Sequence, residues 1–229
     1  MSANQPTIRA LTMKALGRFG AAFLILGAVF FLSAGTLSYW EAWGYLAILC
    51  IPAFCVLAYL IRNDPELLER RMRMQEKEAE QKLIIKWSYV IFLAAFLLPG
   101  FDRRYGWSSV PAAVVIVADI IVLLGYGVFA LVLKENRYAS RVIDVEQQQE
   151  VIMTGPYAWV RHPMYLGVSL MFVFSPLALG SYWGIIPTVL VIVLLAARIG
   201  NEESVLLSQL KGYREYTEKT RYRLFPGVW

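Results

Sequence analysis

Six apolar stretches dominate the chain, and polar or charged residues separate them. A helix needs about 20 predominantly apolar residues to cross the hydrocarbon core of a bilayer. The first, second and fourth stretches are long enough, whereas the other three are short. The pattern predicts an all-α fold, a polytopic membrane bundle of about six apolar helices. The stretches are Phe19 to Leu37, Trp43 to Ile61, Trp87 to Leu98, Val110 to Leu133, Met164 to Leu179 and Trp183 to Ala197.

The last two stretches form a short hairpin at the C-terminal end of the bundle. The segment 180–182 joins them, and at about 1.5 Å per residue each arm reaches only about 24 Å. Because the arms are antiparallel, their far ends must lie side by side. We therefore expect His162 to lie near Arg198, Glu202 and Glu203. Arg198 and Glu202 share a helix face, while Glu203 points about 100° away.

A charged segment follows the second apolar stretch. The residues 64–66, Asp-Pro-Glu, are a helix start, since Asp caps a helix and Pro suits its first position. A solvated helix on the membrane surface is predicted through Lys82, as a connector or, alternatively, as a gate over an active site. Opposite charges recur four residues apart, on one helix face. These pairs are Glu66–Arg70, Glu69–Arg73 and Glu78–Lys82.

Composition and charge indicate a membrane protein and predict how it is oriented in the membrane. The chain is 58% hydrophobic and 17% charged, which is typical of membrane proteins. Of its 22 Lys and Arg residues, 20 fall before Phe19, in 62–86, in 134–163 or from Arg198 onward. Since cytoplasmic loops carry the positive charge, both termini should be cytoplasmic. The net charge of +5 favours anionic lipid headgroups, and nothing indicates nucleic acid.

Two features inside the apolar stretches invite functional interpretations. The run 125–130 has the glycine spacing of a dinucleotide fingerprint, but such a motif works only in a strand-to-helix turn. We interpret its glycines as helix-packing positions. Asp119 is an acid well inside a span, where carboxylates are functional candidates by default. A buried hydrogen bond and a role in a polar pocket remain equal alternatives, and we assign Asp119 no catalytic role.

The run from Gly155 to Tyr165 carries the only histidine of the chain. Pro163 suits the first turn of the fifth helix and places His162 just outside it. The free N–H groups and the dipole of that helix start then offer a seat for an anion. An interfacial belt that anchors the helix in headgroups is the alternative. A zwitterionic cofactor would use this helix start for its carboxylate and a glutamate near Arg198 for its ammonium group.

These motifs resemble the isoprenylcysteine carboxyl methyltransferase and phospholipid methyltransferase superfamily of membrane enzymes. The resemblance runs from about Asn136 to the C-terminus, and upstream the chain is similar only in being apolar. Members bind S-adenosylmethionine without a Rossmann domain. The matching motifs are Gly155-Pro156-Tyr157, Arg161-His162-Pro163-Met164-Tyr165-Leu166-Gly167, Glu202-Glu203, Leu206, Gly212-Tyr213, Tyr216 and Pro226.

The resemblance also implies which residues form the site. Arg198 falls where the carboxyl methyltransferases have an arginine facing the substrate carboxylate. Gln149 stands where the prenylcysteine branch can have histidine, which bears on the substrate more than on the cofactor. We expect one domain over 1–229, with spans in 1–133 and the cofactor-binding core in 134–229. The cofactor-binding residues implied are Gln149, Val151, Ile152, Tyr157, His162, Pro163, Met164, Tyr165 and Glu202.

The leading hypothesis is an enzyme that transfers a methyl group from S-adenosylmethionine to a lipophilic acceptor entering from the bilayer. For a carboxylate acceptor such as an isoprenylcysteine, Arg198 would hold the acceptor; this is the reaction we favour. For an amine acceptor such as phosphatidylethanolamine, Glu203 would act as the base. An NADPH-dependent membrane reductase and a transporter or lipid-packing scaffold are less favoured. We expect no metal, and a prokaryotic inner membrane or, alternatively, the endoplasmic reticulum.

Overall fold

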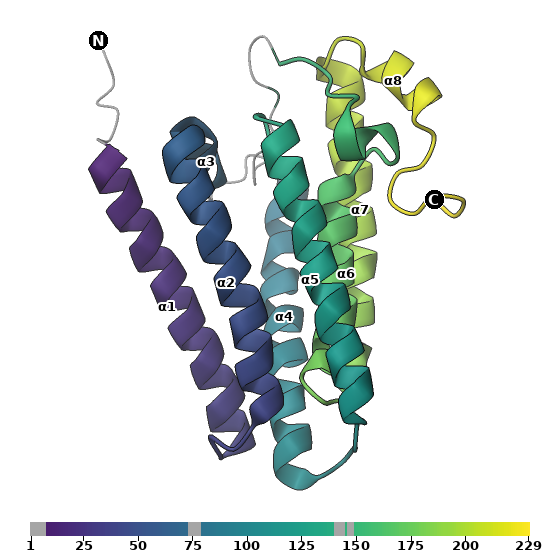
Figure 1. Cartoon of the computed structure of the whole chain (residues 1–229). Helices are drawn as coiled ribbons and strands as arrows, with labels where there is room; N and C mark the ends of the chain where they lie inside the picture. Colours follow the sequence, from purple (N-terminus) through teal and green to yellow (C-terminus); the bar gives the residue numbers. More distant parts are fainter. Residues whose placement is uncertain (1–7, 73–78, 140–144, 146–148) are drawn as a thin grey trace.

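Over the residues that the structure describes, the chain forms a bundle of six main helices with shorter elements at one end (Figure 1). The computed structural model describes residues 8–72, 79–139, 145 and 149–229, with the backbone alone at 79–85 and 88. This architecture confirms the predicted all-α, polytopic membrane fold. The helices are α1 (Ile8–Ala34), α2 (Trp40–Asn63), α3 (Pro65–Met72), α4 (Ala79–Tyr105), α5 (Ala112–Glu135), the 3-10 helix η1 (Gly155–Ala158), α6 (Pro163–Ala178), α7 (Ile185–Gln209) and α8 (Tyr213–Lys219).

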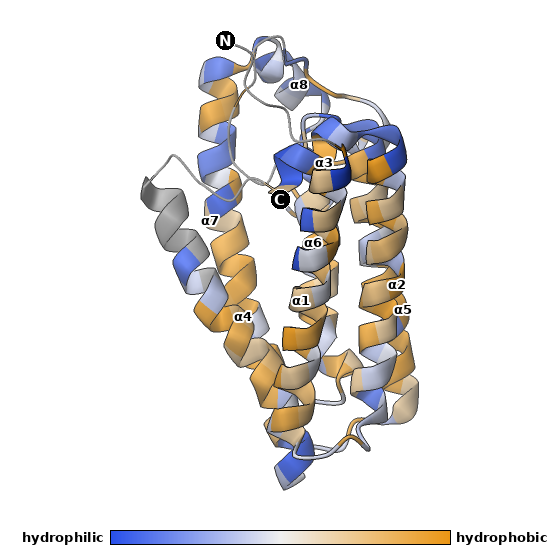
Figure 2. Ribbon diagram, turned by 90° about the vertical axis from the view of Figure 1, so that its left-hand side faces the viewer, coloured by the Kyte–Doolittle hydropathy of each residue, from blue (hydrophilic) through white to orange (hydrophobic). Residues whose placement is uncertain are grey.

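The helices cross the bundle in alternating directions. Within the described part of the chain, α1, α2, α5 and α7 are each long and apolar enough to span a membrane, and α6 is a shorter apolar helix. Figure 2 shows apolar residues along the middle of the bundle and hydrophilic ones at its ends. We call the end where α1 begins and α7 ends the site end, and the opposite end the far end. Exposed aromatic residues at the far end, including Trp40, Trp107 and Trp183, are typical of a membrane interface.

The length of α4 differs from the prediction, and the predicted surface helix is described only in part. The third apolar stretch was expected to give a short helix, but α4 has 27 residues and extends beyond the stretch at both ends. Of the surface helix predicted through Lys82, the described part is α3 up to Met72, and the segment 79–82 belongs to α4; residues 73–78 lie outside the described residues. The Glu66–Arg70 pair is present, with 3.8 Å between its charged atoms. The pairs Glu69–Arg73 and Glu78–Lys82 lie outside the described residues.

The C-terminal hairpin agrees with the prediction in its first arm and differs from it in its second. α6 is short, with 16 residues, but α7 has 25 and continues to Gln209. The apolar stretch ends before Arg198, whereas the helix does not, because the residues that follow include good helix formers such as Glu202 and Leu206. The last three turns of α7 therefore rise beyond its apolar part. This extension carries one wall of the site.

α5 and α6 pack closely through two glycines. A Cβ atom added at Gly125 would lie 2.7 Å from the backbone oxygen of Gly167, and one at Gly167 would lie 2.6 Å from that of Gly125. Gly125 is thus a helix-packing position, as predicted, whereas Gly127 has no such neighbour within 4 Å. Among the described residues, Asp119 Oδ1 is buried without a hydrogen-bond partner, so the hydrogen bond considered for that atom is not found there.

Candidate active site

Three segments that are distant in sequence meet at the site end. α6 starts there, the polar end of α7 lies beside it, and the tail that follows α8 runs past both (Figure 1). His162 Nδ1 lies 3.8 Å from Glu202 Oε1, and His162 Nε2 lies 3.3 Å from Glu203 Oε1. The expected proximity of the histidine and the two glutamates is therefore confirmed, and it follows from the antiparallel packing of α6 and α7.

The loop before α6 has its conformation fixed by glycine and proline residues. Gly155 has a φ of +56°, a conformation that residues with a side chain rarely adopt. The carboxyl carbon of Glu135 would lie 3.0 Å from a Cβ atom there, so the position also needs the small residue. Pro163 is the first residue of α6, and His162 precedes it with a φ of −122°, outside the helix. The histidine ring thus sits at the helix start, as the Pro163 position predicts.

An open cavity lies between the α6 start, the α7 end and α8, and holds about 890 Å³ of empty space, part of it open to solvent. All nine residues that the sequence assigns to a cofactor line this cavity, and so does Arg198. They are Gln149, Val151, Ile152, Tyr157, His162, Pro163, Met164, Tyr165 and Glu202. The structure thus gathers these residues around one cavity; their roles toward a cofactor stay a proposal.

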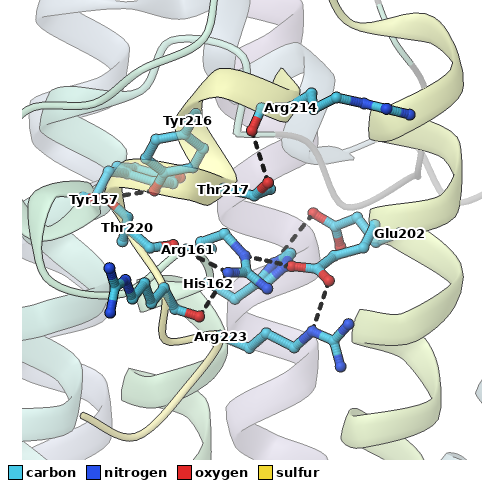
Figure 3. Close-up of polar contacts among 11 residues, drawn as sticks. Tyr157, Arg161, His162, Glu202, Arg214, Tyr216, Thr217, Thr220 and Arg223 are labelled. Atoms are coloured by element: carbon cyan, nitrogen blue, oxygen red, sulfur yellow. Dashed lines mark hydrogen bonds and ion pairs between the residues drawn. The ribbon is translucent and has the colours of Figure 1, made fainter. Parts of the chain in front are cut away.

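Glu203 is the exception, because it is absent from the cavity wall and its side chain is only 5% exposed. Its carboxylate accepts a hydrogen bond from Arg161 Nε and another from Arg223 Nε, each at 2.6 Å. His162 Nε2 is its third neighbour, at 3.3 Å. Figure 3 shows Arg161, His162 and Arg223 converging on this point beside Glu202. We call these four residues, Glu203, Arg161, His162 and Arg223, the Glu203 cluster.

A second chain of polar contacts faces the cavity. Tyr165 donates from its hydroxyl to Glu202 Oε2 at 2.6 Å, and Arg198 Nε donates to the same hydroxyl at 2.9 Å. The Glu202 side chain is 25% exposed, five times the fraction of Glu203, so a carboxylate with room for a further partner borders the cavity. The two neighbouring glutamates therefore occupy different environments, as their 100° offset on a helix predicts.

The C-terminal tail is joined to the loop before α6 by backbone hydrogen bonds. The amides of Arg161 and His162 donate to the carbonyl oxygens of Tyr222 and Arg223, each at 2.9 Å. The Arg161 guanidinium adds bonds to the carbonyl oxygens of Thr220 and Arg221, at 3.0 and 2.7 Å. Arg161 thus connects α7, the loop and the tail. Arg161 also belongs to the cavity lining.

Tyr157 connects the loop to α8 and to the end of α5. Its hydroxyl accepts a bond from Asn136 Nδ2 at 2.8 Å, and its carbonyl accepts one from the Tyr216 hydroxyl at 2.7 Å. Burial raises the pKa of the Tyr157 phenol to about 12. The phenol therefore stays protonated at neutral pH and can donate its own hydrogen into the cavity.

Several cavity and cluster residues were not assigned roles from the sequence. Arg161 stood inside the recognised motif, but nothing in its spacing indicated that it would hold Glu203. Arg223 lies in a tail without regular structure, which gives no periodicity from which to place it. Asn136 marked the edge of the resemblance, and its bond to Tyr157 requires the tertiary fold. Among the described residues, no group of three or more His, Cys, Asp or Glu side chains gathers where it could hold a metal ion.

One known protein family matches part of the sequence. No curated protein matches the sequence. Residues 113–212 match the family model described as phospholipid methyltransferase. The match begins in α5, earlier than the resemblance at Asn136 indicated, and ends just before α8. It includes the α6 start and both glutamates. Over 113–212 the sequence is thus similar to phospholipid methyltransferases, which belong to the superfamily that its motifs resemble.

Proposed function

We propose that the protein transfers a methyl group from S-adenosylmethionine to a lipophilic acceptor at the membrane surface. The observation that carries this proposal is the pairing, around one cavity, of a helix start with the Glu202 carboxylate. The first N–H groups of α6 have no partners within the helix and suit a carboxylate. Glu202, beside them, suits an ammonium group. The site thus fits the zwitterionic amino-acid part of the cofactor.

The residues of the site then act mainly by positioning. When bound, the cofactor supplies a methyl group whose bond to sulfur breaks as the acceptor bonds to it, leaving S-adenosylhomocysteine. Such a displacement depends on alignment of the reacting atoms, so a rigid wall matters more than an acid or a base. Tyr165 provides that wall, because its hydroxyl is held between Glu202 and Arg198. Arg198 also presents a positive charge at the cavity for an anionic acceptor.

For the acceptor we propose a carboxylate, as in an isoprenylcysteine-like substrate. A carboxylate is already nucleophilic and loses no proton on methylation, so the site needs a cation to hold it and no base. Arg198 lines the cavity and meets this need. Glu203, the base considered from the sequence, is held by Arg161 and Arg223 away from the cavity wall. We therefore assign Glu203 to positioning rather than to proton removal.

A phospholipid amine is the second candidate acceptor. The description of the matching family favours it, and Arg198 would then hold the lipid phosphate. This reaction requires a base to remove a proton from nitrogen. Glu202 would be that base, since its carboxylate borders the cavity.

Orientation follows from charge in this proposal. Most Lys and Arg residues fall in the segments at the site end, so we propose that this end faces the cytoplasm of a prokaryotic cell. The cofactor then enters from the cytoplasm and the acceptor from the bilayer.

Purified protein incubated with methyl-labelled cofactor and extracted membranes tests the acceptor. A carboxyl ester loses its label in mild base, whereas an N-methyl product keeps it. Base-stable label would contradict the carboxylate assignment and support the amine. Before that, calorimetry with S-adenosylhomocysteine and with NADPH tests the cofactor. Failure to bind the former at millimolar concentration would contradict the methyltransferase proposal, and tight binding of the latter would favour a reductase.

A further inference from the structure

Tyr213 presents a buried hydroxyl beside the cavity. It is the first residue of α8, its side chain is 4% exposed, and it belongs to the cavity lining. Among the described residues, its hydroxyl oxygen is buried without a hydrogen-bond partner. A buried hydroxyl in this state costs free energy, about 1–3 kcal/mol. The cost calls for a group that satisfies this hydroxyl in the working protein.

The neighbouring tyrosines show that the fold satisfies such groups where it needs them for structure. Tyr216, on the same helix and 5.7 Å from Tyr213 between ring centres, donates to the Tyr157 carbonyl. Tyr157 in turn has its hydroxyl bonded by Asn136. Tyr213 shares their hydrophobic cluster with Leu210, Leu206 and Val151, so its ring is well packed. Packing therefore explains its ring but not its hydroxyl.

We propose that the Tyr213 hydroxyl binds the cofactor, donating a hydrogen bond to a polar atom of the bound S-adenosylmethionine. This inference rests on the proposed function and adds a residue of α8 to the site, beyond the 113–212 family match. Tyr213 lines the cavity while its hydroxyl oxygen is buried, so the ligand would reach that oxygen after a small shift of α8 or through one bridging water. α8 thereby closes one wall of the site.

The direction of this hydrogen bond follows from the surroundings. Burial raises the pKa of the Tyr213 phenol, and the carboxylates of Glu203 and Glu202 raise it further. The hydroxyl therefore keeps its proton at neutral pH and has one hydrogen to donate. An acceptor atom of the nucleoside or the amino-acid carboxylate of the ligand suits it.

The test compares Tyr213→Phe with Tyr216→Phe in purified full-length protein. Each variant is measured for thermal unfolding without ligand and for the Kd of S-adenosylhomocysteine by calorimetry. Removal of a hydroxyl that has no partner should leave unfolding of the ligand-free Tyr213→Phe protein unchanged or shift it upward. The same variant should bind S-adenosylhomocysteine about 5–10-fold more weakly, the effect of one lost hydrogen bond. Tyr216→Phe, which loses a bond within the protein, should unfold earlier without ligand.

The other outcomes separate the inference from the proposed function. Equal Kd values for Tyr213→Phe and the wild type would overturn the inference and leave the function standing. Earlier unfolding of ligand-free Tyr213→Phe, to the extent seen for Tyr216→Phe, would also overturn it, because the hydroxyl would then have a partner in the chain. Absence of S-adenosylhomocysteine binding in the wild type would overturn the proposed function itself, and the inference with it.

Discussion

Replacing Glu203 with glutamine should loosen the tail from the loop before α6. The carboxylate accepts one arginine bond on each oxygen, from Arg161 on Oε1 and from Arg223 on Oε2. A glutamine side chain has one carbonyl oxygen, so its NH2 group must face the other arginine, donor against donor. Hydrogen bonds to charged groups contribute about 1.5–3 kcal/mol each. One of the two arginine bonds is therefore lost, and the remaining one is made to a neutral amide oxygen instead of a carboxylate.

The expected loss of stability is about 2 kcal/mol. A buried charge left alone costs more, about 3–5 kcal/mol. Arg161, however, keeps its bonds to the carbonyl oxygens of Thr220 and Arg221, and Arg223 is partly exposed, so we use the lower figure. For a chain of this size, that loss corresponds to a fall in unfolding temperature of about 4–8 °C. Because the tail and His162 border the cavity, the affinity for S-adenosylhomocysteine should fall about tenfold, which is ~1.4 kcal/mol.

Thermal unfolding in detergent and calorimetry measure both effects, with Glu218→Gln as the control. Glu218 is an exposed residue of α8, so the same chemical change there should alter neither quantity. Hydrogen exchange at the amides of Arg161 and His162 adds a local readout, since both bond to the tail. Wild-type unfolding temperature and affinity in Glu203→Gln would refute the positioning role. Normal stability and binding combined with lost turnover would show that Glu203 acts as a base after all.

Two further predictions test the cavity and the bundle. Glu202→Gln should weaken binding of S-adenosylhomocysteine about tenfold, whereas Arg198→Ala should spare that affinity and reduce methylation of the acceptor; normal binding by both variants would contradict these roles. Gly125→Ala should lower the unfolding temperature because its Cβ would lie 2.7 Å from a backbone oxygen of α6, whereas Gly127→Ala, with open space, should be neutral or slightly stabilising. Equal unfolding temperatures would show that α5 and α6 can separate there at little cost.

The helical fold was predictable because hydrophobicity along the chain carries it. Apolar stretches mark spans, and Pro163 marks the start of α6, since both effects act within one helix turn or one membrane thickness. Helix ends were less predictable. α7 continues as a helix past Arg198, where its residues become more polar, and hydropathy reports the environment of a segment rather than its backbone conformation.

The sequence could predict which residues lie near one another at the cavity, but not the contacts that they make. His162, Glu202 and Arg198 could be placed together because antiparallel helices bring their ends together. Arg223 could not, because it lies after α8 in a tail without a regular period, and only the folded tail sets its distance from Glu203. The orphaned hydroxyl of Tyr213 is likewise a property of three-dimensional packing and has no counterpart in a sequence pattern.

The consecutive glutamates explain how one helix end can both stabilise the fold and border the cavity. Adjacent residues on a helix point about 100° apart, so Glu202 and Glu203 cannot share one environment. The structure places Glu203 among Arg161, Arg223 and His162, where its charge is balanced within the protein. Glu202 borders the cavity, and a cationic group of a ligand is the partner that its carboxylate still lacks in this proposal. Because His162 contacts both glutamates, a displacement in the Glu203 cluster reaches the cavity through the histidine. Arg223→Ala leaves Arg161 and His162 in contact with Glu203. The loss of affinity for S-adenosylhomocysteine should therefore be larger for Glu203→Gln than for Arg223→Ala.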